Sequence, residues 1–304
     1  MVDCIKIQIY VRTLIDFFFN HPSLEWLGEE EKLHHIYNDE ILTKVRKQFR
    51  GIVFCFYNDK LDIIFKPHYY FNNNVHNAND FSPANCISVI VEFQNAFEID
   101  LSLLPVVNLE FGVNIPQPYD IRDLITFLYS HGRNEFRADP DAPFSKKSHS
   151  YNKHGKPNTF KIFKGYAKGI QFPNYCHKDT FRWEQKSKRS KRMKGIRVET
   201  MADLLKSESY VQMAKSLRSE FDKVIILDDT VSRQKLSASE KCELEKYMNP
   251  NTWYRHQQKS RNVFGNHVRK FNALQQKLGK NMKQTIAKLI DEKLDELCPK
   301  EKCA

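Results

Sequence analysis

Residues 160–169 of the chain read FKIFKGYAKG, with polar and apolar side chains in alternation. A period of two is typical of a half-buried β-strand, so we expect a strand over residues 160–168. Residues 181–188 predict a second strand, after a turn near residues 173–174. One face of the first strand would present two lysines and a tyrosine: Lys164, Tyr166 and Lys168.

The sequence before these strands predicts an α+β domain. Alternation predicts a strand over residues 2–11. The charged segment 22–48 carries leucines in one stripe and predicts a helix. The other expected elements are a hairpin of 50–57 and 61–71, a helix from Ser82-Pro83 to Phe97, a strand over 105–115, a helix from Asp120 that Gly132 ends, a loop over 138–158, and helices from Thr200 to Asp222.

The C-terminal part predicts helices only. One helix over 249–278 and another over 281–297 are separated by Gly279. This break permits a helix-turn-helix, although a plain helical hairpin is the simpler arrangement. The layout therefore predicts an α+β domain over residues 1–230 and a basic helical module over residues 231–304.

The composition excludes several classes of protein. With 304 residues, 41% of them hydrophobic, the chain can bury a sizeable core. No stretch approaches 18 uncharged apolar residues and the start does not resemble a signal peptide, so we expect a soluble, cytoplasmic protein with no membrane partner. Seven cysteines without a C-x-x-C pair predict neither a disulfide framework nor a zinc ribbon. Walker loops and G-x-G-x-x-G or H-E-x-x-H motifs are absent from the sequence.

The positive charge is concentrated in the second half of the chain. Residues 1–140 hold 12 Lys and Arg against 19 Asp and Glu, whereas residues 141–304 hold 36 against 18. Such clustering indicates a polyanionic partner, for which nucleic acid is the first candidate. A well-solvated basic surface is the alternative.

The densest basic run covers residues 182–197, with eight basic residues and one acid. On a strand that ends in a turn, such side chains can reach several phosphates, which supplies affinity without sequence readout. A solvated charge run or a localisation signal is the alternative. The nucleic-acid-binding residues that we expect are Lys164, Arg182, Lys186, Lys188, Arg189, Lys191, Arg192 and Lys194.

Tyr166 is the candidate nucleophile. The charges of Lys164 and Lys168 would favour its phenolate, and a phenolate can attack a phosphodiester. A tyrosine that is merely exposed near DNA, or packed in the core, is the alternative.

A carboxylate in the strand 105–115 predicts a site for a hard cation. Glu110 lies between apolar neighbours, so it must be solvated, paired with a cation or bound to a metal. With Glu184 and His68, it could hold Mg²⁺ or Mn²⁺. A salt bridge from Glu110 to a neighbouring strand is an equally good interpretation. His68 belongs to the segment 66–80, whose aromatic and amide residues could instead stack single-stranded bases or form an Asn-rich turn.

Four segments together resemble a known family. They read VDCIKIQI at 2–9, NLEFGVNI at 108–115, FKIFKGYAKGIQF at 160–172 and FRWEQKSKRSKRMKGI at 181–196. Over about residues 1–230 the chain is similar to phage and plasmid replication initiators of the filamentous-phage type, in particular members from Bacteroidetes phages and mobile elements.

The resemblance implies a rolling-circle replication initiator of a phage or plasmid in a bacterial host cell. Such a protein has an RRM-like antiparallel sheet with flanking helices, and nicks one DNA strand with a tyrosine and a divalent metal. The family's Y-x-K and R-x-E strands match Tyr166, Lys168, Arg182 and Glu184. The implied partners are origin DNA, single-stranded or as a hairpin, and host replication proteins.

One departure from the family leaves alternatives open. Many such initiators bind the metal through a His-hydrophobic-His motif, and this sequence has no H-x-H triplet. Either a carboxylate such as Glu110 replaces the motif, or the nicking activity is lost. A non-catalytic DNA-binding regulator of a mobile element is therefore the main alternative, and an RNA-binding module on an RRM-like sheet is the third.

We expect DNA binding to weaken steeply with salt, because Lys and Arg displace condensed counterions. With about five phosphates contacted, the logarithm of the binding constant should fall against the logarithm of salt concentration with a slope near −4 to −5. Fluorescence anisotropy over a salt series measures this slope. A slope near zero would contradict the assignment of a polyanionic partner.

Overall fold

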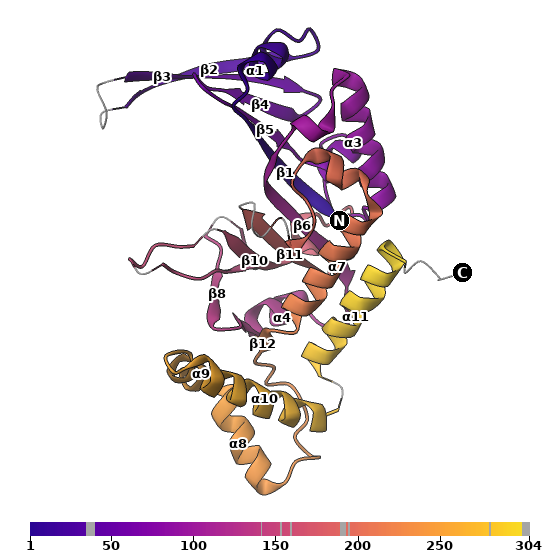
Figure 1. The fold of residues 1–304 in the computed structure, drawn as a ribbon. Coiled ribbons are helices and arrows are strands. Elements are labelled where there is room, and N and C mark those ends of the chain that lie inside the picture. Colours follow the sequence, from indigo (N-terminus) through magenta and orange to yellow (C-terminus); the bar gives the residue numbers. More distant parts are fainter. Residues whose placement is uncertain are drawn as a thin grey trace. The chain divides into compact units, whose positions relative to one another are not determined.

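The computed structural model (Figure 1) describes residues 1–34, 40–140, 142–152, 154–158, 160–188, 193, 195–279 and 281–299, with only the backbone described for 31–34 and 40–43. The chain forms two compact units. Unit 1 comprises Met1–Gly112, Gln185–Ser216 and Leu297–Ala304, and unit 2 comprises Val113–Glu184 and Leu217–Glu296. These units divide the chain differently from the boundary expected at residue 230, so separable modules remain a prediction.

The centre of unit 1 has the strand order of an RRM. Its core strands are β1 (Val2–Ile9), β4 (Ile52–Phe56), β5 (Leu61–Phe65) and β6 (Val106–Pro116), in the order β6-β1-β5-β4. Helices α1 (Arg12–Phe19) and α3 (Pro83–Phe97) lie between them in sequence, which gives the β-α-β-β-α-β succession. The pairs β1–β5, β1–β6 and β4–β5 are antiparallel. The expected α+β fold with an RRM-like antiparallel sheet is confirmed.

Aromatic side chains join both helices to this sheet. Phe18 of α1 lies 5.4 Å from Phe54 of β4 and 5.4 Å from Phe97 of α3, between ring centroids. Phe93 of α3 stacks on Phe65 of β5 at 5.6 Å. Helix α3 begins as the sequence predicts, because the Ser82 hydroxyl accepts a hydrogen bond from the backbone N–H three residues on.

The helix predicted over 22–48 is wrong, because this segment forms the hairpin strands β2 (Glu25–His34) and β3 (Glu40–Phe49). Charges of opposite sign face each other across the hairpin: Glu30 pairs with Lys44 at 3.5 Å and with Arg46 at 3.0 Å. Gly28 lies at a shift in the register of the hairpin. Its backbone φ of 147° is one that few residues other than glycine adopt. The leucine stripe alone does not reveal this pairing.

Three further boundaries differ from expectation. The strand over 61–71 ends at Phe65, because Pro67 begins helix α2 (Pro67–Phe71). Helix α4 (Ile121–Phe127) ends before strand β7 (Leu128–His131), and Gly132 lies in the following turn instead. The loop over 138–158 contains strand β9 (Ser145–Ser148).

Unit 2 contains its own antiparallel strands. Besides β7 and β9 they are β8 (Asn134–Ala138), β10 (Lys161–Ala167), β11 (Thr180–Lys188) and β12 (Val224–Ile226), in the order β12-β7-β8-β9-β10-β11. Strands β6 and β11 contribute residues to both units. Trp183 of β11 is fully buried, stacks on Phe163 of β10 at 5.6 Å, and donates to the Leu217 carbonyl oxygen of α7 (Ser207–Phe221) at 3.1 Å. Both strands expected over 160–168 and 181–188 are therefore confirmed.

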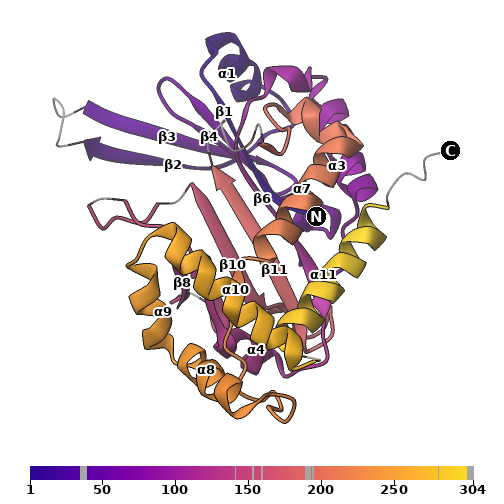
Figure 2. The same ribbon diagram turned by 60° about the horizontal axis from the view of Figure 1, so that its bottom comes forward.

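The C-terminal helices are α8 (Ala238–Met248), α9 (Pro250–Gln257), α10 (Arg261–Lys277) and α11 (Met282–Leu297). The single helix expected over 249–278 is two helices, since Ser260 caps a new one. Figure 2 shows α8, α9 and α10 grouped together. Their apolar cluster includes Ile225 and Leu227, so these helices share a core with the region of β12 within unit 2.

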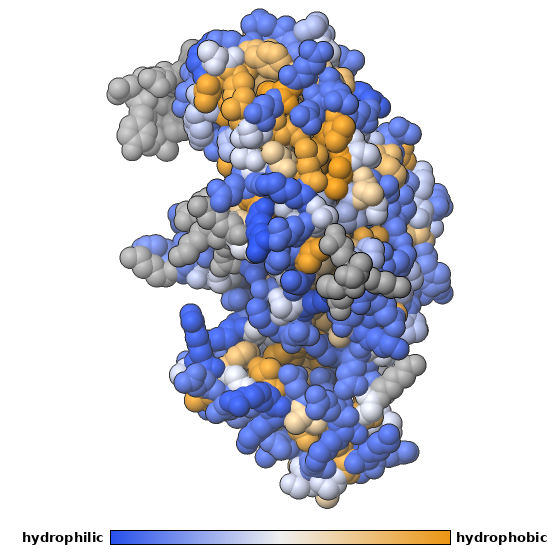
Figure 3. Space-filling view, turned by 45° about the vertical axis from the view of Figure 1, so that its right-hand side comes forward, coloured by the Kyte–Doolittle hydropathy of each residue, from blue (hydrophilic) through white to orange (hydrophobic). Residues whose placement is uncertain are grey.

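The face drawn in Figure 3 is mostly hydrophilic, and apolar side chains gather at its top, over unit 1. Exposed large apolar residues of this unit include Phe17, Trp26, Phe71 and Val91. In the part of the chain that the structure describes, none of the helices is long and apolar enough to cross a membrane.

A buried carboxylate in unit 2 provides a test of the packing. Glu220 of α7 accepts hydrogen bonds from His131 Nε2 at 2.9 Å and from Lys161 Nζ at 2.5 Å. Burial alone would raise the pKa of Glu220, but these hydrogen bonds hold it well below the usual 4.5.

We expect Glu220→Gln to lower the free energy of unfolding by about 1–3 kcal/mol at pH 7, because Lys161 loses its counter-charge and buried His131 loses a charged acceptor. A folded-state pKa below the unfolded value stabilises the protein above pH 4.5 and ceases to do so as the pH falls. Urea denaturation should therefore show the difference shrinking in acid. Glu292→Gln is the control, because its pair with Lys288 is exposed, and a loss as large there would contradict the assignment.

Candidate active site

Strand β10 presents the face that the alternation predicts. Phe163, Gly165 and Ala167 are buried, whereas Lys164 and Tyr166 are partly exposed. A side chain at Gly165 would collide with Leu128, because an added Cβ would lie 2.7 Å from its Cδ1 atom. The glycine thus lets β10 pack closely on the core and leaves the opposite face of β10 for chemistry.

Glu184 of β11 lies at the centre of a polar cluster in unit 2. Its side chain is buried, with 3% of the residue exposed. Lys164 Nζ lies 2.6 Å from Oε1, and the Tyr166 hydroxyl donates to Oε2 at 3.1 Å. Arg182 Nε donates to the same Oε2 at 3.4 Å. The carboxylate therefore contacts two cations and the phenol together, and we call Lys164, Tyr166, Arg182 and Glu184 the Glu184 cluster.

Asn114 of β6 extends the Glu184 cluster to a third strand. The Arg182 guanidinium is 1% exposed, and its Nη1 donates to Asn114 Oδ1 at 2.7 Å. Asn114 is itself buried. The register between strands that brings Asn114 to Arg182 is not visible in the sequence.

Lys168 also lies beside Tyr166, but it belongs to a helix and not to strand β10. The strand ends at Ala167, and Lys168 begins the short helix α5 (Lys168–Gln171). Its Nζ lies 5.3 Å from the centre of the Tyr166 ring and donates to Gln171 Oε1 at 2.9 Å. Two cations on Glu184 and a third over the Tyr166 ring leave the region positively charged, which favours a phosphate.

A cavity of about 320 Å³ adjoins the Glu184 cluster. Lys164 and Tyr166 line it together with residues of the β8–β9 connection and α5: Asp139, Ala142, Pro143, Ser145, Ala167, Ile170 and Gln171. A reacting group could therefore approach the Tyr166 hydroxyl from this side.

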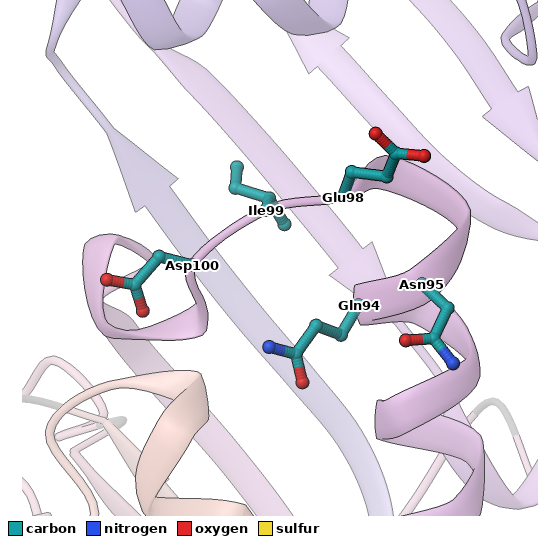
Figure 4. A pocket seen from close by; sticks show the side chains of 5 residues that line it. All are labelled: Gln94, Asn95, Glu98, Ile99 and Asp100. Atoms are coloured by element: carbon teal, nitrogen blue, oxygen red, sulfur yellow. The ribbon is translucent and has the colours of Figure 1, made fainter.

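A second cavity, of about 570 Å³, lies in unit 1 at the end of α3 (Figure 4). It is lined by Gln94, Asn95, Glu98, Ile99 and Asp100. Its charged side chains are both acidic, so it would repel a phosphate.

The three predicted metal ligands have other partners. Glu110 forms an ion pair with Lys186 within unit 1, as the salt-bridge alternative requires. His68 is buried in unit 1, where Nε2 lies 2.8 Å from Asn79 Oδ1 and Nδ1 lies 3.5 Å from Asp3 Oδ1. Glu184 belongs to unit 2.

These donors do not fit a metal held by three protein ligands. Among the described residues, no three His, Cys, Asp or Glu side chains gather as a metal site would require. The requirement for Mg²⁺ or Mn²⁺ stays a prediction.

The predicted nucleic-acid-binding residues fall into two groups. Lys164 and Arg182 belong to the Glu184 cluster, and Lys186 is paired with Glu110. Burial lowers the pKa of Lys188, at the end of β11. Arg189, Lys191, Arg192 and Lys194 lie outside the described residues.

No family model matches the sequence, and no curated protein matches it. Among solved structures, a rolling circle replication initiator protein from Geobacillus stearothermophilus is similar, with a TM-score of 0.40 and 10% sequence identity. The alignment covers 88% of this chain and 96% of that chain. Similarity at this level leaves the function to be decided by the residues of the site.

Proposed function

We propose that the chain is a DNA-nicking protein that initiates rolling-circle replication of a phage or plasmid, with Tyr166 as the nucleophile. The observation that carries the proposal is the hydrogen bond from the Tyr166 hydroxyl to buried Glu184, at 3.1 Å, beside a cavity. The sequence resemblance over residues 1–230 names the same tyrosine. An isolated tyrosine is a weak nucleophile, and an adjacent base is what activates it.

The reaction that this geometry supports is a transesterification. Tyr166 transfers its proton to Glu184 Oε2 and its oxygen attacks the phosphorus of one DNA phosphodiester. The bond from phosphorus to the 3′-oxygen breaks, and that oxygen takes up a proton from water. A 5′-phosphotyrosyl ester and a free 3′-hydroxyl result, and the ester retains the energy needed to rejoin the strand.

The neighbouring cations have separate tasks in this proposal. Lys164 is 2.6 Å from Glu184 and lines the cavity, so it is placed to face both the base and the incoming phosphate. Lys168 lies over the Tyr166 ring and favours negative charge on the phenol oxygen. Arg182 is almost fully buried, and with Asn114 it holds Glu184 in place.

A non-catalytic DNA-binding regulator remains the second candidate. It is favoured by the pairing of Glu184 with Lys164 and Arg182, because two cations on one carboxylate also form a stable structural network. The two candidates differ in a single product, the covalent protein–DNA adduct.

We expect Tyr166→Phe to abolish this adduct and to leave DNA affinity within about threefold, under 1 kcal/mol. The variant lacks the attacking oxygen but keeps the ring and the surrounding cations. A labelled single-stranded oligonucleotide and denaturing gel electrophoresis detect the adduct, and mass spectrometry of the digested product locates it. The control is Tyr175→Phe, at an exposed tyrosine of unit 2. Nicking that persists in Tyr166→Phe would move the nucleophile elsewhere.

We expect Glu184→Gln to slow nicking by about 10²–10⁴-fold, the usual contribution of a positioned base. The amide keeps the shape of the side chain but cannot take the proton. Single-turnover rates with and without a chelator then distinguish Glu184 acting as a base alone from Glu184 acting together with a divalent metal. If a chelator stops nicking in the wild type, the predicted metal is needed, whereas metal-independent nicking leaves Glu184 as a base alone. Unchanged rates in Glu184→Gln would contradict both roles.

A further inference from the structure

We infer that helices α9 and α10 act as a helix-turn-helix, in which α10 reads the sequence of duplex DNA from the major groove. Helix α9 ends at Gln257 and α10 begins at Arg261, so only Gln258, Lys259 and Ser260 connect them. A turn of three to four residues between two helices is typical of this motif. In it, the second helix presents its N-terminal half to the base edges. Figure 2 shows the two helices side by side with α8.

A dedicated apolar core fixes the two helices together. Trp253 of α9 is fully buried and donates through Nε1 to the Tyr247 carbonyl oxygen of α8 at 2.7 Å. Its ring lies 6.0 Å from Phe264 and 5.3 Å from Phe271 of α10. The buried side of α10 is thus defined by aromatic contacts, and its opposite side faces solvent.

The solvent side of α10 carries the residue types that recognise bases. Asn262, Asn266 and Arg269 are exposed, and their spacing of four and three residues places them in one row. Asparagine pairs with adenine and arginine with guanine by two hydrogen bonds each. Arg269 also donates to Asn266 Oδ1, which holds the two side chains together.

The positive charge of α10 agrees with a DNA partner. Helix α10 contains four basic residues and no acidic residue in the sequence RNVFGNHVRKFNALQQK. Arg255, Lys259, Arg261 and Lys270, around the turn and on α10, are all exposed. Such cations suit the phosphates on either side of a groove.

Gly265, in the same exposed region, has no explanation within the chain. Glycine inside a helix costs about 1 kcal/mol relative to alanine. A Cβ at Gly265 would meet no atom within 4 Å, so no contact among the described residues requires a glycine. Close approach of the helix backbone to a ligand favours a glycine, and a helix seated in a DNA groove makes such an approach.

Arg133 fixes the turn from outside the motif. This residue follows β7, and its guanidinium donates to the Gln257 carbonyl oxygen at the end of α9 and to the Lys259 carbonyl oxygen in the turn, at 3.2 and 2.9 Å. Both contacts lie within unit 2. The start of α10 is therefore oriented by the sheet and not by the helices alone.

B-form DNA is the partner that this surface fits. The major groove of B-DNA admits a helix, whereas that of A-form RNA is too narrow for side chains to read. The inference rests on the proposed function only for the identity of the polymer. It adds a duplex-recognition site that is separate from the Glu184 cluster.

The test begins with selection of a random-sequence DNA duplex library by the full chain. We expect one motif to be enriched. Asn262→Ala and Asn266→Ala should each weaken binding to the enriched duplex by about 5- to 150-fold, and binding to a scrambled duplex should change by less than about threefold. Gly265→Ala should keep or raise the melting temperature and still weaken binding to the enriched duplex.

The matched control is Asn95→Ala, which removes an exposed amide from a helix of unit 1 (Figure 4) and should change neither affinity. No enriched motif, unchanged binding by the two Asn variants, or equal competition by duplex RNA would overturn the inference. Cleavage of single-stranded DNA by the same variants is measured in parallel. Adduct formation without an enriched motif would refute the inference alone, and an enriched motif without an adduct would refute the proposed nicking alone.

Discussion

The constraint on which the site depends is the burial of the Glu184 carboxylate. A carboxylate that is 3% exposed is tolerated only with cations and donors beside it. Lys164 and Tyr166 of β10 and Arg182 of β11 supply these partners, and Asn114 of β6 holds the arginine. Because these groups come from three strands, a shift of register in any of them would leave a buried charge without its partner. The same requirement that fixes the register of these strands also places the Tyr166 hydroxyl on the Glu184 carboxylate.

A comparison with Glu220 shows what separates a structural network from a candidate site. Strand β10 contributes a lysine to both: Lys161 pairs with Glu220, and Lys164 pairs with Glu184. The Glu220 network is completed by His131, whose pKa burial lowers, and whose ring packs 3.8 Å from that of Phe163. The Glu184 cluster instead contains a phenol and adjoins a cavity. Ion pairing alone therefore does not mark a candidate site, whereas a phenol that is hydrogen-bonded to a carboxylate and lines a cavity is a candidate nucleophile.

The sequence predicted those parts of the molecule that depend on local periodicity. Strands β10 and β11 and their polar faces follow from the alternation of residues, and α3 follows from the Ser82 cap. The hairpin β2–β3 was mistaken for a helix, because the partner of Glu30 lies on another strand and charge alone has no period. The contact between Tyr166 and Glu184 was missed for the same reason: the faces were visible in the sequence, but the register between strands was not. The division at Ser260 could have been found, since a serine before a new apolar stripe is an ordinary cap signal.

Two of the cations beside Tyr166 are buried, whereas those of α9 and α10 are exposed, and the two groups suit different tasks. Arg182 and Lys168 are each 1% exposed. They therefore cannot displace the counterions condensed on DNA, as Lys and Arg on the surface do. In the proposed nicking reaction these two buried cations would act through the electric field at the Tyr166 oxygen, where a low dielectric makes each charge more effective. The exposed cations of α9 and α10 have the opposite character, because water screens them but they can reach the DNA backbone. If the protein nicks DNA as proposed, the exposed cations that would hold the duplex can change without disturbing the buried charges around Tyr166.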